Sequence, residues 1–267
     1  MPVWLSSCCG PAVLSDFPSG ITDEVAHRPW PMPDAPWIMT QSWHDLLFAH
    51  WPVGADVLRA HVPPGLELDL FEGQAWLGIV PFHMTNVAPR AVPALPWVSA
   101  FAELNVRTYV RVGSKPGVYF FSLDASNPLA VLVARTMFNL PYYAASMEVA
   151  SERETVRYAS HRDVSAGVKA DFVASYRAIG PVFSAQPGSL DYFLTERYCL
   201  YTVNDAFELR RLEIHHPPWL LQVAETAIEE NTMADAAGIR LPSMAPRLHF
   251  ARRQDMVAWA PAPVDGR

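Results

Sequence analysis

The segment 103–111, Glu-Leu-Asn-Val-Arg-Thr-Tyr-Val-Arg, carries the residue types in this chain that are best suited to chemistry. Side chains of an extended strand alternate between its two faces, so Glu103, Asn105, Arg107 and Tyr109 share one face. In an enclosed interior, Arg107 could clamp a carboxylate or carbonyl group, Asn105 could orient it, and Glu103 could act as an acid or base. On an exposed strand the same row would face solvent, and the sequence leaves both interpretations open.

Two further side chains could move a proton at such a site. Tyr109 lies on the face just described, and His83 lies in a second strand-like segment, Trp76–Met84. A lone histidine on an apolar face is more often a buried core residue than a catalytic group, so both interpretations of His83 stay open. His215 and Trp219 belong to the segment His-His-Pro-Pro-Trp and could contact a bound ligand.

The histidines do not form a recognised metal-binding motif. Adjacent side chains on an extended chain point to opposite sides, so His215 and His216 cannot bind one ion together. Neither His-Glu-x-x-His nor Cys-x-x-Cys occurs in the chain. A metal-dependent hydrolase that gathers the distant His83, His215 and His249 is therefore a minor alternative, and we predict no metal and no cofactor.

The composition excludes several classes of protein. The 267 residues carry a net charge of −7, with 51% apolar and 18% charged residues. An acidic chain without a basic stripe is not typical of a nucleic-acid binder, and no apolar run approaches the ~20 residues of a membrane helix. Three cysteines are too few for a disulfide framework, which favours a reducing, cytoplasmic location. We expect a small organic ligand as partner, no nucleic acid and no membrane, and a homo-oligomer remains open.

Length and patterning predict one folded domain. Residues 1–37 lack periodicity and are rich in Pro, Ser and Gly, so we predict a disordered N-terminal extension there. Residues 38–262 then form the domain, and residues 263–267 form a tail.

The elements that must position the candidate residues are mostly strands, because short apolar runs alternate with turn signals along the chain. Asn127 and Pro128 are typical of a helix start, and apolar residues surround the helix that follows to Phe138, which predicts a buried helix. Shorter helices are predicted at 55–61 and 233–237. Strands are predicted at 43–49, 75–85, 102–111, 118–124, 155–160, 171–177, 197–203, 208–214, 223–229, 248–252 and 256–260.

This pattern predicts an α+β, sheet-rich fold. Many strands with few long helices favour an antiparallel sheet that curls into a barrel or cone, with a few peripheral helices. A doubly wound nucleotide-binding fold is not expected, because no glycine-rich turn joins a strand to a helix.

The chain resembles the YqjF-like bacterial family of uncharacterised proteins from about residue 42 to residue 261. The segments that carry this resemblance are LLFAHWPV (46–53), VPPGLELD (62–69), WLGIVPFHM (76–84), FAELNVRTYV (101–110), KPGVYFFSLDA (115–125), LPYY (140–143), LTERYCLYT (194–202), IHHPPW (214–219) and LHFARR (248–253). The resemblance implies no activity, because none is established for that family.

More distantly, the N-terminal half is similar to acetoacetate decarboxylases, and this similarity implies their cone-shaped barrel. It is carried by the segments 55–69 and 76–85, and by Glu103-Leu104, which resembles the Glu-Leu that precedes the Schiff-base lysine of those enzymes. A Lys-Lys pair follows that Glu by six and seven residues in decarboxylases, whereas this chain has Tyr109 and Val110. Tyrosine cannot form an imine, so we predict no Schiff-base decarboxylation.

Three functions are compatible with these residues. The first is a barrel whose interior binds a small carboxylate- or carbonyl-bearing molecule and that could act as a non-Schiff-base lyase or hydratase. The second is a non-catalytic binding or structural module, in which the row at 103–107 is a salt-bridge network or an exposed face. The third is the metal-dependent hydrolase.

Overall fold

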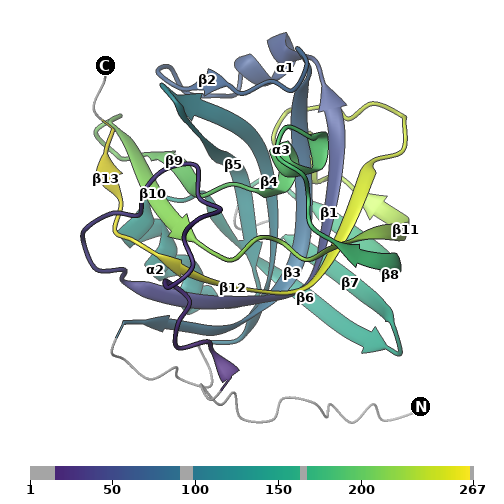
Figure 1. Ribbon diagram of the computed structural model, residues 1–267. Helices are drawn as coiled ribbons and strands as arrows, with labels where there is room; N and C mark the ends of the chain where they lie inside the picture. The colour runs from purple at the N-terminus through teal and green to yellow at the C-terminus, as the bar shows by residue number, and fades with distance from the viewer. Residues whose placement is uncertain (1–15, 91–98, 163–166, 265–267) are drawn as a thin grey trace.

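The computed structural model describes residues 16–90, 99–162 and 167–264, and in these ranges the chain forms thirteen strands and four short helices (Figure 1). The strands are β1 (Met39–Val53), β2 (Glu67–Leu68), β3 (Ala75–Pro89), β4 (Phe101–Val112), β5 (Lys115–Ala125), β6 (Tyr142–Glu152), β7 (Thr155–Arg162), β8 (Asp171–Phe183), β9 (Cys199–Val203), β10 (Leu209–His215), β11 (Leu221–Asn231), β12 (Arg247–Ala258) and β13 (Ala262–Pro263). The helices are α1 (Ala55–Arg59), α2 (Pro128–Phe138), α3 (Leu190–Thr195) and α4 (Met233–Ala236). The predicted sheet-rich class with few helices is confirmed.

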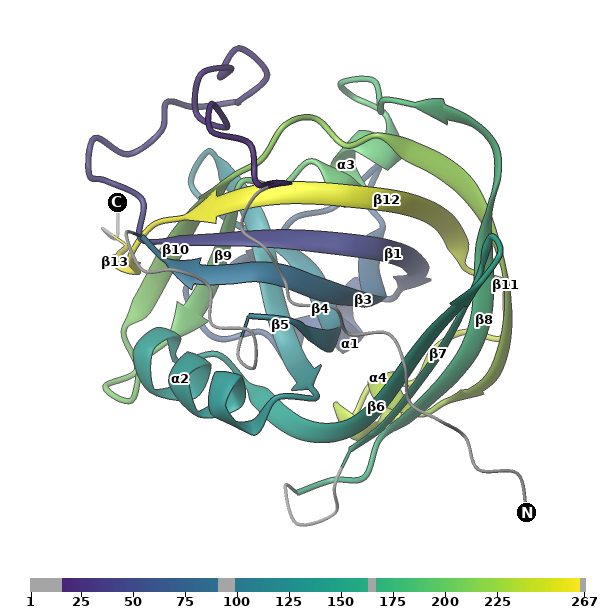
Figure 2. The same cartoon turned by 90° about the horizontal axis from the view of Figure 1, so that it is seen from below.

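The strand pairings return to their starting point along two routes. One route is β5-β6-β7-β8-β11-β12-β1-β3-β4 and back to β5, which we call the nine-strand ring. The other is β5-β9-β10-β12-β1-β3-β4 and back to β5, which we call the seven-strand ring. The two rings share β1, β3, β4, β5 and β12 (Figure 2). One face of these shared strands therefore lines the nine-strand ring, and the other face lines the seven-strand ring. Most pairings are antiparallel, as predicted, but β5 runs parallel to both β6 and β9.

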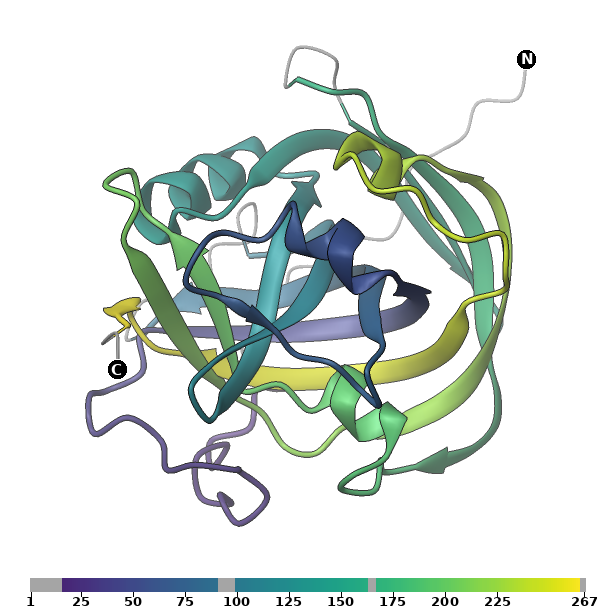
Figure 3. The same ribbon diagram turned by 90° about the horizontal axis from the view of Figure 1, so that it is seen from above.

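The nine-strand ring is filled by hydrocarbon. Its largest apolar cluster joins residues from β1, β3 and β4 to residues from β7, β8 and β11 on the opposite side, among them Leu104, Tyr158 and Phe172. Leu58 of α1 and Met233 of α4 close the cluster at one end, where α1 lies across the ring in the view from above (Figure 3). Close packing of this kind holds the shared strands in place, and they then form a wall for the second ring.

Helix α2 has the predicted boundaries but not the predicted burial. The Asn127 side chain accepts hydrogen bonds from the backbone amides of Leu129 and Ala130, and Pro128 occupies the first turn. Only Val131 and Phe138 are buried, while Leu132 remains 59% exposed. The prediction of a buried helix was wrong because α2 lies alongside the seven-strand ring (Figure 2) and is covered on one side only.

Most predicted strands are present, and several extend beyond the predicted boundaries, although β9 begins two residues later than predicted and β10 is shifted by one residue. The segments 248–252 and 256–260 are one continuous strand, β12, because no turn interrupts the pairing with β1. Strand β6 and helix α3 were not predicted. Most side chains of β6 are partly or fully exposed, so its sequence lacks a clear alternation of apolar and polar residues. Helix α3 spans only six residues, which is too short for a helical pattern to be recognised.

Residues 16–37, which the sequence places outside the domain, lie against the sheet in the structure. The Arg28 guanidinium is buried beside Glu213 of β10 at 3.3 Å, and Ile21 packs against Val257 and Trp259. At the other end, Pro263 pairs with Arg210 in β10. Residues 1–15 and 265–267 lie outside the described residues. No helix in the described ranges is long and apolar enough to span a membrane.

Candidate functional site

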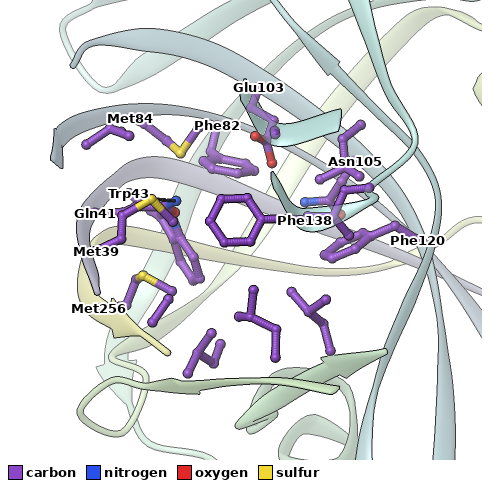
Figure 4. A pocket seen from close by; sticks show the side chains of 18 of the residues that line it. Met39, Gln41, Trp43, Phe82, Met84, Glu103, Asn105, Phe120, Phe138 and Met256 are labelled. Carbon is purple, nitrogen blue, oxygen red and sulfur yellow. Dashed lines mark hydrogen bonds between the residues drawn. The ribbon is translucent and has the colours of Figure 1, made fainter. Parts of the chain in front are cut away.

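The seven-strand ring surrounds a cavity of about 410 Å³. Its walls come from β1, β3, β4, β5, β9, β10 and β12, and α2 closes one side. Most of the lining side chains are apolar, and Figure 4 shows methionine and aromatic side chains converging on it from several strands. The size of the cavity is in the range of small-molecule sites in proteins.

The row on β4 faces this cavity. Glu103, Asn105 and Arg107 all line it, while Leu104 and Val106, between them, enter the apolar cluster of the nine-strand ring. The alternation of a strand therefore divides β4 between the two rings. The structure brings together the acid, the amide and the guanidinium that the sequence placed on one face.

Glu103 is buried, with 4% of its surface exposed, and its carboxylate accepts a hydrogen bond of 2.7 Å from the hydroxyl of Tyr142. Burial raises the pKa of Glu103 to about 7, although hydrogen bonds from Tyr142 and Asn105 act in the opposite direction. The Asp124 carboxylate nearby also raises this pKa, because two negative charges repel. A carboxyl group that titrates near neutral pH can either donate or accept a proton there.

Two polar atoms of the row have no partner among the described residues. They are the buried Oδ1 of Asn105 and the buried Nε of Arg107. Arg107 is held by a 3.3 Å hydrogen bond from Nη2 to the carbonyl oxygen of Leu194 and by the ring of Phe48, 5.4 Å from the guanidinium carbon. Unpaired buried polar atoms are costly, so an acceptor at Asn105 and a donor at Arg107 are suited to a ligand.

Tyr109 does not line the cavity, although it lies on the same side of β4 as the row. Its hydroxyl donates to the carbonyl oxygen of Leu194 at 2.7 Å and lies 2.6 Å from Nε2 of His50. Burial lowers the pKa of His50 well below its usual range, which favours the neutral ring. Because the single hydroxyl proton of Tyr109 is donated to Leu194, we assign the proton of the His50–Tyr109 contact to Nε2 of His50. The Leu194 carbonyl oxygen of helix α3 thus accepts hydrogen bonds from both Tyr109 and Arg107, and the helix covers the Tyr109 hydroxyl.

The structure separates the other predicted residues into two groups. Trp219 lines the cavity and stacks on Trp43, with ring centroids 5.9 Å apart. His83 faces away from the cavity and stacks on His44 with centroids 4.9 Å apart. His215 also lies outside it, with Nε2 at 2.8 Å from the carbonyl oxygen of Ile21. Neither ring lines the cavity, so these positions do not support the proton-transfer role predicted for His83 or the ligand contact predicted for His215.

His216 occupies the place that the sequence assigned to His215. It lines the cavity, is 1% exposed, and stacks on Tyr198 with ring centroids 4.6 Å apart. Burial lowers the pKa of His216, which favours the neutral ring. Adjacent side chains point to opposite sides, so the pair had to place one ring inside and one outside, but the sequence does not say which.

The structure does not bring together the three histidines of the predicted metal alternative. His83 stacks on His44, His215 contacts Arg28, and His249 lies 3.0 Å from the carboxylate of Asp191. Among the residues that the structure describes, no three His, Cys, Asp or Glu side chains are placed to hold a metal ion.

Sequence reasoning left two parts of the site undecided. Tyr142, the partner of Glu103, lies in the segment Leu-Pro-Tyr-Tyr, which would suit a core or a pocket equally well. Arg197 lines the cavity and pairs at 2.6 Å with Asp69, which is 128 positions away in the chain. No local signal reveals either contact, because each partner is distant in the chain.

The chain is similar to proteins without an assigned activity. The family DUF2071, described as an uncharacterized conserved protein, matches residues 40–255. The uncharacterized protein YqjF of Bacillus subtilis (strain 168) is 49% identical over 239 residues, which make up 90% of this chain and 98% of that protein. The resemblance predicted from the sequence is confirmed.

Solved structures with the same fold are known at low sequence identity. Acetoacetate decarboxylase from Legionella pneumophila has a TM-score of 0.58 at 13% identity, over 89% of this chain and 93% of that chain. The enduracididine biosynthesis enzyme MppR, solved in complex with pyruvate, has a TM-score of 0.59 at 12% identity, over 87% of this chain and 92% of that chain. Likeness at this level of identity shows the fold alone.

Proposed function

The chain belongs to the DUF2071 family of uncharacterized conserved proteins, and we propose that its closed sheet is a cone-shaped barrel that binds a small carboxylate- or carbonyl-bearing molecule. One observation carries this proposal. Glu103, Asn105 and Arg107 form a row in an otherwise largely apolar cavity, and two of them present buried polar atoms without a partner.

The chemistry of the row fits such a ligand. Arg107 offers a buried N–H donor for a carboxylate oxygen, and the carboxamide oxygen of Asn105 accepts a hydrogen bond from a hydroxyl or enol. MppR, a protein of the same fold, was solved with pyruvate, which has both a carboxylate and a ketone. This supports a ligand of that class for the cavity.

Acid–base chemistry is the reaction type that this site supports. With its pKa near 7, Glu103 exchanges a proton with a ligand carbon or oxygen at neutral pH, while Arg107 neutralises the ligand carboxylate. These are the roles that a lyase or hydratase needs. A Schiff base is not part of the proposal, because neither lysine of the chain, Lys115 or Lys169, lines the cavity.

The proposal is tested by the thermal stabilisation that pyruvate and hexanoate produce. We expect both compounds to raise the melting temperature of the wild type, and Arg107→Leu to abolish this rise. Arg111→Leu is the matched control, because Arg111 lies on the same strand with its side chain 51% exposed beside Glu67. If Arg107→Leu is stabilised as strongly as the control, the proposed role of the row is wrong.

A further inference from the structure

The polar and apolar parts of the cavity lie at different levels of the same strands. Along β4 the lining residues follow in the order Arg107, Asn105, Glu103 and Phe101. The register with β3 places Gly78 opposite Arg107 and Met84 opposite Phe101. The cavity therefore changes from polar to apolar along the axis of β4.

Other strands continue the apolar part beyond Phe101. Strand β3 pairs with β1 so that Met84 lies opposite Trp43, and β1 pairs with β12 so that Gln41 lies opposite Met256. Figure 4 shows Met39, Met84 and Met256 on the side of the cavity away from Asn105. Gln41 is polar, but its carboxamide oxygen already accepts a hydrogen bond of 2.7 Å from the indole of Trp43.

Helix α2 completes this apolar end. Phe138 is buried with Leu212, Met256 and Ala258, and Ala134 packs against the same cluster. In Figure 4 the ring of Phe138 lies between the methionine side chains and Asn105. An apolar compartment of this kind stabilises hydrocarbon and offers nothing to a second charged group.

The volume of the cavity sets the size of the ligand. One water molecule takes up roughly 30 Å³ in the liquid, and we assign the same volume to each non-hydrogen atom of a ligand. A cavity of about 410 Å³ then holds roughly 14 non-hydrogen atoms. Pyruvate has six and would leave most of the apolar end empty. A carboxylate group uses three atoms, which leaves space for a hydrocarbon part of roughly ten carbons.

We infer that the ligand is an amphipathic carboxylic acid, with its carboxylate at Arg107 and an unbranched or aromatic hydrocarbon part directed toward Met39, Met256 and Phe138. This inference rests on the proposed function, since it keeps the same head-group site. It adds that chain length, and not the head group alone, determines which acids bind.

The test uses straight-chain carboxylates of two to fourteen carbons as probes, with dissociation constants measured by titration calorimetry. Each added methylene should strengthen binding roughly fourfold, which is the effect of burying one CH₂ group. We expect the gain to continue to roughly ten or twelve carbons and then to stop, because the cavity is full.

A variant of α2 locates the hydrocarbon part. Ala134→Phe places a ring in the apolar end, so the longest chain that still gains affinity should shorten by three or four carbons, while acetate binds as in the wild type. Leu132→Phe, on the outer side of the same helix, should leave the whole series unchanged, because Leu132 is 59% exposed and does not line the cavity.

The outcomes separate this inference from the proposed function. If every chain length binds with one affinity and Arg107→Leu abolishes binding, the inference is wrong and the proposed function stands. If no carboxylate binds in a way that depends on Arg107, both are wrong. If Ala134→Phe does not fold, the chain-length series on the wild type still decides the question.

Discussion

The hydroxyl of Tyr142 donates a hydrogen bond of 2.7 Å to the carboxylate of Glu103, and this contact joins the first residue of β6 to the row on β4 that lines the cavity. Both side chains are buried, so the carboxyl group is kept from water and its pKa rises to about 7. The pair couples the stability of the protein to the protonation of its proposed site.

Replacing Glu103 should change how stability depends on pH. The pKa in the folded protein, about 7, exceeds the ordinary value of 4.5, so the native state keeps a proton that the unfolded chain has already lost. The contribution of Glu103 to the free energy of unfolding therefore falls as pH rises from 4.5 to 7, by roughly 3 kcal/mol at 1.36 kcal/mol per pH unit. Buried histidines such as His50 and His216, whose pKa values are lowered, contribute in the opposite direction, and they are common to the wild type and the variant. Urea unfolding of both proteins across the pH range isolates this contribution, and Glu103→Gln should gain roughly 3 kcal/mol of stability relative to the wild type between pH 4.5 and pH 8.

The exposed Glu148 provides the control for this experiment. Glu148→Gln makes the same chemical change at an exposed position of β6 and should follow the wild type across the whole pH range. If the difference in stability between Glu103→Gln and the wild type is the same at pH 4.5 and pH 7, the raised pKa of Glu103 is contradicted.

Binding of a carboxylate should also depend on pH. Hexanoate stays ionised above pH 6, and its negative charge favours the neutral form of Glu103 in the same cavity. We expect the dissociation constant to change little between pH 6 and pH 7 and to rise by up to tenfold per pH unit above pH 7, as Glu103 loses its proton. Calorimetry of Glu103→Gln should give one affinity throughout, and a wild type without this rise would contradict the assignment.

The sequence predicts the row on β4 because strand alternation is a local property. Three side chains at a spacing of two residues share a face wherever the strand lies, so Glu103, Asn105 and Arg107 needed no tertiary information. The sequence could not say that this strand would border two rings. That arrangement depends on the second edge of β5, which pairs with both β6 and β9, and the pairing with β9 joins segments that are distant in the chain.

The errors at the site have the same origin. Tyr109 has the correct alternation but is covered by α3, a helix of six residues that sequence patterns do not reveal. His83 and His215 lie on faces that only the packing of their strands determines. Local patterns therefore identify which residues share a face, and tertiary pairings decide what that face contacts.

Tyr109→Phe separates a structural role from a catalytic one. Loss of the hydroxyl leaves the Nε2 proton of His50 without its acceptor and removes the hydrogen bond to the carbonyl oxygen of Leu194, which should cost about 1–3 kcal/mol in the free energy of unfolding. Hexanoate affinity should stay within a factor of two, because Tyr109 does not line the cavity. Tyr119→Phe on β5 is the control for loss of a tyrosine hydroxyl. A large loss of affinity at unchanged stability would instead place Tyr109 at the ligand.

Reduction with borohydride in the presence of a ketone should leave the protein without a covalent adduct. A Schiff base needs a buried amine whose pKa is lowered, so that the neutral nitrogen attacks the carbonyl. Lys115 is paired with Glu213 at 3.2 Å, and the hydrogen bond to Asp171 raises the pKa of Lys169 instead of lowering it. Intact mass spectrometry after incubation with pyruvate and borohydride should therefore show the unmodified chain. An adduct that Lys115→Arg removes would mean that Lys115 reaches the ligand, and the acid–base role proposed for Glu103 would have to be abandoned.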